Sequence, residues 1–271
     1  MFGIALDLKK SHFAEVLKAP KSLLTGICAQ WIVLPLLTYI LILITKPEPS
    51  IALGMILVAA CPGGNISNFF SSIAGANVEL SIVMTCISSV LAIILTPLLL
   101  SYYGYMYEPT AEIMRSVSLD WWEVTQAIIL IIIIPIICAQ LFGAKFPEAS
   151  IRLKNFLRVT SMGLFVAIVI GAFANNFDFF LDYVWLVFLL VLVHNFIAIF
   201  SGFTLGRIMK LSTSDVKSLS IEVGIQNSGL GLLLIFSFFS GLGGMAIVAA
   251  WWSIWHIITG FILSFTWRKF T

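Results

Sequence analysis

The sequence predicts an all-α protein that crosses a membrane several times, and three observations lead to this fold class. Apolar residues make up 60% of the 271 residues, against about 45–50% in an ordinary soluble domain. Only 10% of the residues are charged, where about 25% is usual. The apolar residues also fall in runs longer than the roughly 18 residues that mark a transmembrane helix. So little charge cannot cover a soluble protein of this size, and we expect a multi-pass integral membrane protein.

Eight apolar runs are long enough to span the bilayer, and their short connections predict one transmembrane bundle without a separate soluble domain. A further run, 1–6, is predicted to be the end of another span, a helix stub. The long connection 103–121 is flanked by tyrosines and tryptophans, which is typical of a segment at the membrane interface. The predicted full spans are 22–45, 51–75, 80–102, 122–142, 159–175, 183–206, 214–240 and 245–267.

The basic residues predict the orientation of the bundle. With eight full spans, all but two of the 15 lysines and arginines fall on one side, and only Lys46 and Arg115 fall on the other. By the positive-inside rule the crowded side, which holds the C-terminus, is cytoplasmic. The predicted location is the plasma membrane, or the inner membrane of a bacterium. A net charge of +2 without a basic cluster does not favour binding of nucleic acid.

Two spans are interrupted at their centres. Span 51–75 contains Cys-Pro-Gly-Gly-Asn at 61–65, and span 214–240 contains Glu-Val-Gly-Ile-Gln-Asn-Ser-Gly at 222–229. Proline and glycine weaken a helix, and unwound backbone at membrane depth is tolerated only where it is buried in protein or lines a cavity. Either interruption alone is compatible with a simple kink. A pair in corresponding places is typical of the site of a secondary transporter.

The order of the spans predicts two inverted repeats of five helices. The interrupted spans are the second and the seventh of the eight, so they cross the membrane in opposite directions. In the second repeat the interrupted helix is the fourth, so two helices are expected upstream of 22–45. Residues 1–6 would end the second of these. We expect that about one and a half helices are lacking, through a late start codon or a genuine short form.

Polar side chains at these depths point to cation binding. Among the 13 acidic residues Glu222 alone falls well inside a span, and buried carboxylates usually serve an ion or substrate path. The alternative is a structural carboxylate that neighbouring helices satisfy. Hydroxyls recur at helical spacing on one face of span 80–102, so we expect that face to point inward, although back-bonding to the helix is an alternative use. Sodium, a hard cation, binds several such oxygens. The hydroxyl residues are Ser81, Thr85, Ser88 and Ser89.

The interruptions resemble the central motifs of the bile acid:sodium symporter family, and the resemblance runs over the whole chain, from Met-Phe-Gly at 1–3 to Trp-His at 255–256. The motifs are CPGGNISN at 61–68 and EVGIQNSG at 222–229. The resemblance implies ten helices in two inverted repeats, with a core domain in which two interrupted helices cross and a panel domain that rocks against it. The core helices would lie in 22–102 and 183–267, and the panel helices in 1–6 and 122–175.

The resemblance also implies two sodium sites close to the crossing. Glu222 would serve both sites. Because one carboxylate would face two positive ions, the site would favour an anionic partner. The first site would use Ser67, Asn68, Ser81, Thr85 and Glu222, and the second Gln30, Glu222, the main chain at Val223 and Ile225, and Gln226.

An organic carboxylate or sulfonate is the expected substrate class. Helix N-termini attract anions, and the second halves of the interrupted helices begin near Asn65 and Asn227. The resemblance adds His256, for which a packed, hydrogen-bonded histidine is the alternative. Asn65 stands where one member of the family carries threonine, and Ile257 where that member carries asparagine. The sequence therefore does not predict bile acid itself as the substrate.

The leading hypothesis is a sodium-coupled symporter of a small organic anion that works by alternating access. Proton coupling through Glu222 and a truncated paralogue that binds without transporting are the alternatives within membrane proteins. An intramembrane enzyme that uses Cys61, His256 or Glu222 is less favoured, because no nucleophile and base stand at a recognisable spacing. Sodium-stimulated uptake would separate the first hypothesis from the others.

Overall fold

A computed structural model of the chain is helical in its regular structure, as the sequence predicts. The predicted stub 1–6 lies outside the described residues, and the predicted span 159–175 is described only at single positions. The described residues are Val16, 20–117, 121–150, 177–269 and single positions between 151 and 176.

Five described helices are long and apolar enough to cross a membrane. Each coincides with a span predicted to be uninterrupted, within a few residues at its ends. The remaining two predicted spans that the described residues cover are the interrupted ones, and each is split into two helices. The five long helices are Pro20–Thr45, Val78–Met106, Trp122–Lys145, Val187–Ile208 and Gly243–Arg268.

The first long helix consists of α3 (Pro20–Cys28), a π-helical turn η1 (Ala29–Val33) and α4 (Leu34–Thr45). Pro35 lacks an amide hydrogen, so the regular hydrogen-bond ladder cannot continue through the start of α4, and the wider turn lies directly before it. The π turn contains Gln30, which is completely buried. A local change of winding therefore positions one of the predicted ligands.

The predicted span 51–75 is a broken helix. α5 (Pro49–Ala59) is capped at its N-terminus by Glu48, whose carboxylate accepts hydrogen bonds from the backbone of the first turn. It ends before Pro62, and the chain resumes as α6 (Ile66–Ile73) with Asn65 at its N-terminal boundary. The start of the second half near Asn65 is as predicted.

The predicted span 214–240 is also broken, but its break is narrower than predicted. α13 (Thr213–Gly224) and α14 (Ser228–Phe238) are separated only by residues 225–227. Glu222 therefore lies in the last turn of α13 rather than in unwound chain, and the predicted break at 222–229 is wrong in extent. A single glycine at a helix end weakens the helix by only about 1 kcal/mol, which tertiary contacts outweigh here.

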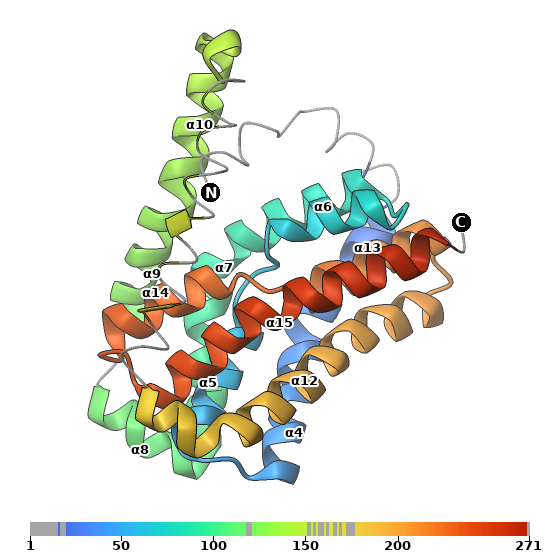
Figure 1. Cartoon of the computed structure of the whole chain (residues 1–271). Helices are drawn as coiled ribbons and strands as arrows, with labels where there is room; N and C mark the ends of the chain where they lie inside the picture. The colour runs from blue at the N-terminus through green and yellow to red at the C-terminus, as the bar shows by residue number, and fades with distance from the viewer. Residues whose placement is uncertain are drawn as a thin grey trace.

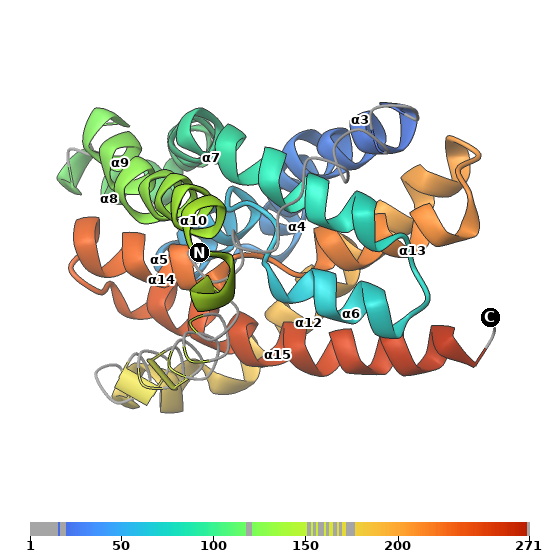
Figure 2. The ribbon, with the colours of Figure 1, turned by 90° about the horizontal axis from the view of Figure 1, so that it is seen from above.

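Small residues allow the core helices to approach closely. α12 (Phe177–Ile208) packs on α13 at Gly202, where a Cβ would lie 2.7 Å from the carbonyl oxygen of Leu219. α15 (Gly243–Arg268) packs on α5 at Gly54, where a Cβ would lie 2.8 Å from the α15 backbone. Such contacts between backbones are typical of helix packing in membranes. Figures 1 and 2 show α15 running beside α6 and α12.

The long helix α7 (Val78–Met106) contains Pro97 in its interior. Proline has no amide hydrogen, so the carbonyl of Ile93 loses its helical partner. Thr125 of α9 (Trp121–Ile128) donates a hydrogen bond of 3.2 Å to that carbonyl. The predicted panel helix is thus bonded to α7 beside its internal proline.

From α9 the chain continues through a second π turn, η2 (Ile129–Ile133), into α10 (Ile134–Lys145). Figure 1 shows α10 extending away from the other described helices. Only 12% of the most apolar stretch of the long helix Trp122–Lys145, which includes α10, is buried. This helix therefore leaves most of its apolar surface uncovered by the rest of the described chain.

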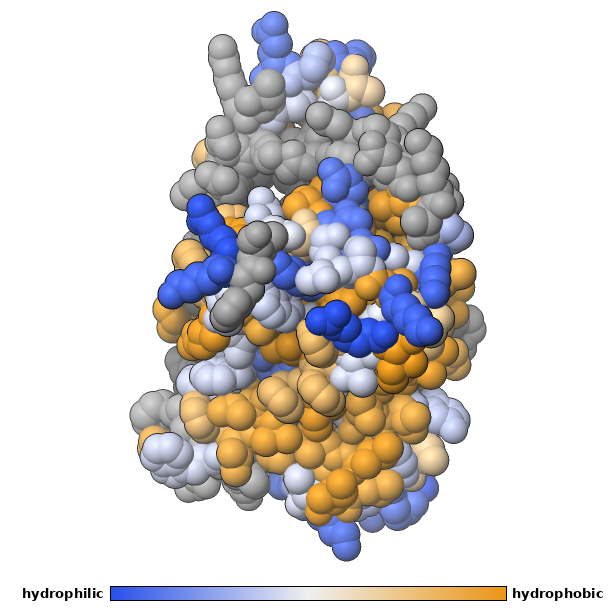
Figure 3. All heavy atoms as spheres, turned by 90° about the vertical axis from the view of Figure 1, so that its right-hand side faces the viewer, coloured by the Kyte–Doolittle hydropathy of each residue, from blue (hydrophilic) through white to orange (hydrophobic). Residues whose placement is uncertain are grey.

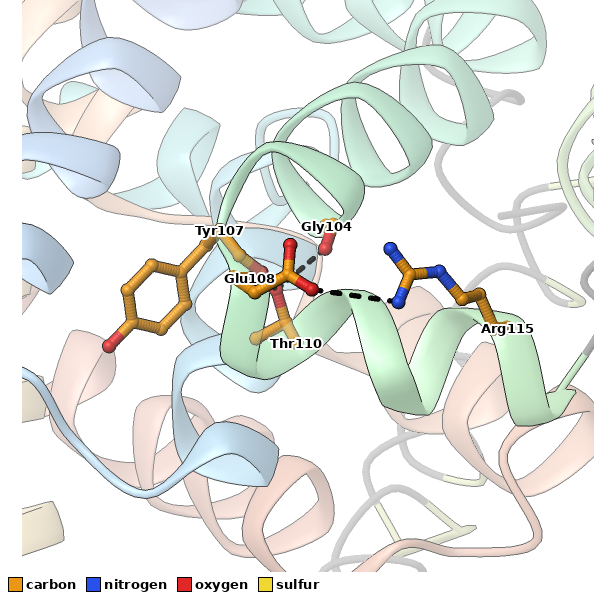
Figure 4. A network of polar contacts seen from close by, with 5 residues as sticks. All are labelled: Gly104, Tyr107, Glu108, Thr110 and Arg115. Carbon is orange, nitrogen blue, oxygen red and sulfur yellow. Dashed lines mark hydrogen bonds and ion pairs between the residues drawn. The ribbon is translucent and has the colours of Figure 1, made fainter.

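The predicted interfacial connection forms a short helix, α8 (Glu108–Val117), against the end of α7 (Figure 4). Thr110 donates a hydrogen bond of 2.6 Å to the carbonyl of Gly104. Arg115 and Glu108 form an ion pair at 3.6 Å with both side chains well exposed, which contributes at most about 1 kcal/mol. The turn between α7 and α8 is thus closed by its own polar groups.

The surface agrees with a lipid environment. On the face shown in Figure 3, apolar side chains cover a broad area of the lower half, with hydrophilic residues above it and at its lower edge. Outward-facing residues of the long helices are large and apolar, such as Ile94 and Phe196, which are 65% and 61% exposed. Exposed apolar area on this scale marks a membrane-facing surface.

Candidate ion and substrate site

The two helix breaks lie against each other in the core. The amide of Gly64 donates to the carbonyl of Ile225 at 2.6 Å, and the amide of Asn227 donates to the carbonyl of Pro62 at 2.9 Å. Between these bonds Gly63 forms an antiparallel bridge with the other break. Backbone that has left its helices is thereby satisfied, which a break at membrane depth requires.

Glu222 is completely buried beside this crossing, and hydroxyl groups from two other helices donate to its carboxylate. Ser67 of α6 and Ser81 of α7 donate to Oε2 at 2.5 and 3.0 Å. Thr85 of α7 donates to Oε1 at 2.6 Å and lies 3.4 Å from the amide oxygen of Asn68. These five residues, here called the carboxylate cluster, are the complete predicted first sodium site.

The local fold explains why the oxygens converge. Ser67 lies in the first turn of α6, directly after the break. Ser81 and Thr85 lie one turn apart on α7, on the predicted inward face, and both are buried. Thr85 and Ser89 also donate back to carbonyls one turn earlier in α7. The back-bonding weighed as an alternative is therefore present, and at Thr85 the single hydroxyl hydrogen is shared between the carbonyl of Ser81 and the carboxylate of Glu222.

Gly63 makes room for the carboxylate. A Cβ on Gly63 would lie 2.3 Å from Oε1 of Glu222, and one on Gly64 would lie 2.8 Å from the carbonyl oxygen of Gln226. The first contact is with the end of a side chain and the second is with backbone. The two glycines of the motif thus serve different purposes, one at the cluster and one at the crossing.

On the other side of the crossing, Gln30 and Gln226 form a reciprocal pair. Nε2 of Gln30 donates to Oε1 of Gln226 at 2.9 Å, and Nε2 of Gln226 donates to Oε1 of Gln30 at 3.2 Å. Gln226 also donates to the carbonyl of Val223 at 2.6 Å, and Gln30 to that of Cys61 at 2.9 Å. We call these groups the amide cluster: the side chains of Gln30 and Gln226 and the main-chain carbonyls of Val223 and Ile225.

The amide cluster contains the predicted second sodium site except Glu222. Within the described residues, the hydrogen bonds of the Glu222 carboxylate all come from the carboxylate cluster. Each proposed ligand oxygen of the amide cluster already accepts a hydrogen bond from an N–H group. The structure thus brings this set together without sharing Glu222 between the two clusters.

The three residues predicted to contact substrate lie at helix starts or on α15. Asn65 and Asn227 are half-buried at the N-terminal boundaries of α6 and α14, and Asn227 accepts a hydrogen bond from the backbone of the first turn of α14. His256 is buried, and its Nδ1 has no hydrogen-bond partner in the described part of the chain. It lies one turn before Gly260, which packs against Phe70 of α6.

A supporting network surrounds the site. Asn195 of α12 donates to the carbonyl of Gly224, at the end of α13, at 2.7 Å, and accepts from Thr259 of α15 at 2.9 Å. His194 lies 2.7 Å from the hydroxyl of Thr38 in α4. His194 and Asn195 thus connect α12 to α4, α13 and α15.

Two polar residues near the site do not emerge from the sequence. Ser71 of α6 donates to Ser81 at 3.3 Å, and its spacing of four residues from Ser67 is the signal that could have identified it. In the sequence, Lys217 is only one of the basic residues that mark the cytoplasmic side of the membrane. The structure places it in α13, 7% exposed, with its amino group on backbone carbonyls.

Comparison with known proteins gives one family. The model of the Sodium Bile acid symporter family matches residues 1–183. An uncharacterized sodium-dependent transporter, YocS, from Bacillus subtilis (strain 168) is 33% identical over 269 residues, covering 99% of this chain and 80% of that protein.

Two further relatives are longer proteins. A probable chloroplastic sodium/metabolite cotransporter, BASS1, from Arabidopsis thaliana is 29% identical over 270 residues, covering 99% of this chain and 65% of that protein. The P3 protein of Homo sapiens is 29% identical over 247 residues, covering 86% of this chain and 48% of that protein. The chain thus spans less than two thirds of the length of either.

Proposed function

The chain belongs to the Sodium Bile acid symporter family, and from this premise we propose that it is a sodium-coupled symporter of a small organic anion that works by alternating access. The observation that carries the proposal is the carboxylate cluster, in which one fully buried carboxylate and hydroxyls from two other helices meet beside the crossing of two broken helices. Such a set of hard oxygens around one negative charge suits a monovalent cation.

Two sodium ions would bind, one in each cluster. In the carboxylate cluster the hydroxyls need only rotate, because a hydroxyl both donates and accepts. In the amide cluster the oxygens of Gln30 and Gln226 would turn from each other to the ion, together with the carbonyls of Val223 and Ile225. Because the hydrogen bonds of Glu222 within the described residues lie in its own cluster, Glu222 would serve the second ion through its negative charge rather than as a direct ligand.

The substrate would be a carboxylate or sulfonate. Two sodium ions opposite one carboxylate leave one positive charge, which favours an anion. The N-terminal ends of α6 and α14 would add backbone donors and the positive ends of two helix dipoles. Asn65 and Asn227 stand at these ends, and Nδ1 of His256, which has no hydrogen-bond partner among the described residues, supplies a further polar group.

Transport would follow from movement of the panel helices against the core. The core would comprise 22–102 and 183–267, and the panel 122–175 with 1–6, across a plasma membrane with the C-terminus in the cytoplasm. The low burial of the helix Trp122–Lys145 supports a movable panel, and the hydrogen bond from Thr125 to the carbonyl of Ile93, which Pro97 leaves without a helical partner, offers a pivot. A membrane potential of 100 mV supplies about 2.3 kcal/mol per charge for uptake.

The test is uptake into proteoliposomes of two labelled probes, the sulfonate taurocholate and the carboxylate cholate. We expect accumulation of at least one probe under an inward sodium gradient, none under an equal potassium gradient, and none with Glu222→Gln. A parallel measurement of ²²Na⁺ binding to the purified protein should show saturable binding that Glu222→Gln abolishes.

Other outcomes would redirect or overturn the proposal. Accumulation that follows a proton gradient and ignores sodium would favour proton coupling through Glu222. Sodium binding without uptake of either probe would exclude these two bile acids as substrates, and the same assay would then be repeated with smaller organic carboxylates and sulfonates before a chain that binds without transporting is favoured. Absence of sodium binding in folded protein would refute the proposal.

A further inference from the structure

The turn between α6 and α7, residues 74–77, is held by the first turns of α13. The backbone amide of Asn77 donates to the carbonyl of Ser214 at 3.2 Å, and its side-chain amide donates to the carboxylate of Asp215 at 2.8 Å. The hydroxyl of Ser218 donates to the carbonyl of Asn77 at 2.7 Å. Three hydrogen bonds therefore fix one residue of this turn onto one face of α13.

Lys217 extends this attachment to α15. Lys217 is 7% exposed. Its amino group donates to the carbonyl of Ala74 at 3.1 Å and to the carbonyl of Trp267 at 3.3 Å. These carbonyls lie at the C-terminal ends of α6 and α15, where helices leave carbonyl groups without intrahelical partners and carry partial negative charge. We call Ser214, Asp215, Lys217 and Ser218, with their bonds to 74–77, the polar clasp.

The clasp joins the three helices that build the carboxylate cluster. α6 supplies Ser67 and Asn68 and ends at the clasp, and α7 supplies Ser81 and Thr85 and begins there. α13 carries the clasp residues and, little more than a turn later, Glu222. Because α6 is a single helix of eight residues, any movement of its clasped end displaces Ser67 at its other end.

We propose that Lys217 is a positioning residue that sets the cation specificity of the carboxylate cluster. Cation sites distinguish ions through the size and rigidity of the oxygen cage. The clasp holds α6, α7 and α13 together at one end. The oxygens that these helices supply would therefore keep the short spacing that sodium needs, which is too small for the larger potassium ion. This inference rests on the proposed function, since it assumes that the cluster binds sodium.

The test is a cation titration of thermal stability on the purified full chain at constant ionic strength. Lys217→Met removes the charge and both hydrogen bonds while keeping length. We expect it to raise the sodium concentration at half-maximal stabilisation about tenfold, a change of about 1.4 kcal/mol, and to narrow the ratio of sodium to potassium affinity. Lys217→Arg, which can donate to both carbonyls, should restore most of the ratio.

Two further variants control the experiment. Lys210→Met makes the same change at an exposed lysine of the loop before α13, and should leave the titration unchanged. Ser218→Ala removes one bond of the clasp, should fold even where Lys217→Met does not, and should shift the sodium midpoint in the same direction by a smaller factor.

The results separate this inference from the proposed function. A lower melting temperature in every salt with unchanged sodium midpoint and selectivity in Lys217→Met and Ser218→Ala would overturn the inference and leave sodium binding standing. A wild-type chain without any sodium response would overturn the proposed function and this inference with it.

Discussion

The carboxylate cluster and the amide cluster lie beside the same crossing of broken helices, but they present their oxygens differently. Around Glu222 the donors are hydroxyls that converge on one charged acceptor. Around Gln30 and Gln226 two amides satisfy each other, and the neighbouring carbonyls accept N–H groups. Hydroxyls can turn a lone pair toward a cation without losing their place, whereas paired amides must give up bonds first.

This difference predicts different costs of ion binding. The carboxylate cluster retains its geometry when a cation enters, because its donors become ligands by rotation. The amide cluster exchanges hydrogen bonds for ion contacts, and each buried polar group left unpaired costs about 1–3 kcal/mol. We therefore expect the carboxylate cluster to dominate the response to sodium. The following substitutions test that contrast, from the largest expected effect to the smallest.

Gly64→Ala should destabilise the protein most. The added methyl would meet backbone at the crossing, 2.8 Å from the carbonyl oxygen of Gln226, and backbone cannot move aside as a side chain can. We expect a loss of about 1–3 kcal/mol in sodium and potassium alike, measured by thermal unfolding. An unfolding temperature equal to that of the wild type would contradict the close backbone pairing.

Gly63→Ala should separate sodium binding from stability. Its methyl would meet the end of the Glu222 side chain, which can shift. We expect a smaller loss of stability in potassium than for Gly64→Ala, but loss of most of the sodium-specific stabilisation. Gly231→Ala is the matched control, because its nearest contact is an ordinary 3.6 Å to Cys61. A Gly63→Ala variant with a full sodium response would show that the carboxylate position is unimportant.

Thr85→Val should weaken sodium binding by about tenfold, or about 1.4 kcal/mol. The substitution keeps the shape of the side chain but removes the hydroxyl that donates to Oε1 of Glu222. Thr96→Val makes the same change on the same helix at a buried hydroxyl without a partner in the described part of the chain. Equal sodium midpoints for the two variants, from titrations of unfolding temperature, would argue against Thr85 as a ligand.

Asn227→Ala should have the smallest effect on sodium binding. It removes the cap of α14, whose loss costs about 0.5–2 kcal/mol, and leaves the carboxylate cluster intact. Asn227→Asp keeps a capping oxygen but adds negative charge, so it should restore stability while weakening binding of taurocholate. If both variants bound the probe as tightly as the wild type, Asn227 would not face the anion.

Much of the site could be predicted because it depends on local patterns. Helix breakers revealed both interruptions, and helical spacing revealed the inward hydroxyl face of α7. The isolated carboxylate in an apolar run revealed Glu222. The end of α13 was misplaced because Asn195, a residue of another helix, binds the carbonyl of Gly224, and no local pattern records that contact.

Other features depend on contacts between distant segments. The reciprocal amides of Gln30 and Gln226 are 196 residues apart in the chain, and Lys217 meets a carbonyl 143 residues away. A lysine near a helix start resembles any basic residue of an inner loop. Lys217 is buried because α6, α13 and α15 pack together around it, as the arrangement of these helices in Figure 2 illustrates.

The most direct test of the account is the thermal stability of the wild-type chain and of Glu222→Gln in sodium and in potassium at equal ionic strength. An ion that binds only the folded state stabilises it by mass action, by about 2.7 kcal/mol at one hundred times its dissociation constant. We expect a sodium-specific rise in the unfolding temperature of the wild type that Glu222→Gln lacks. Equal stability of the folded wild type in both salts, or an undiminished sodium response in Glu222→Gln, would contradict it.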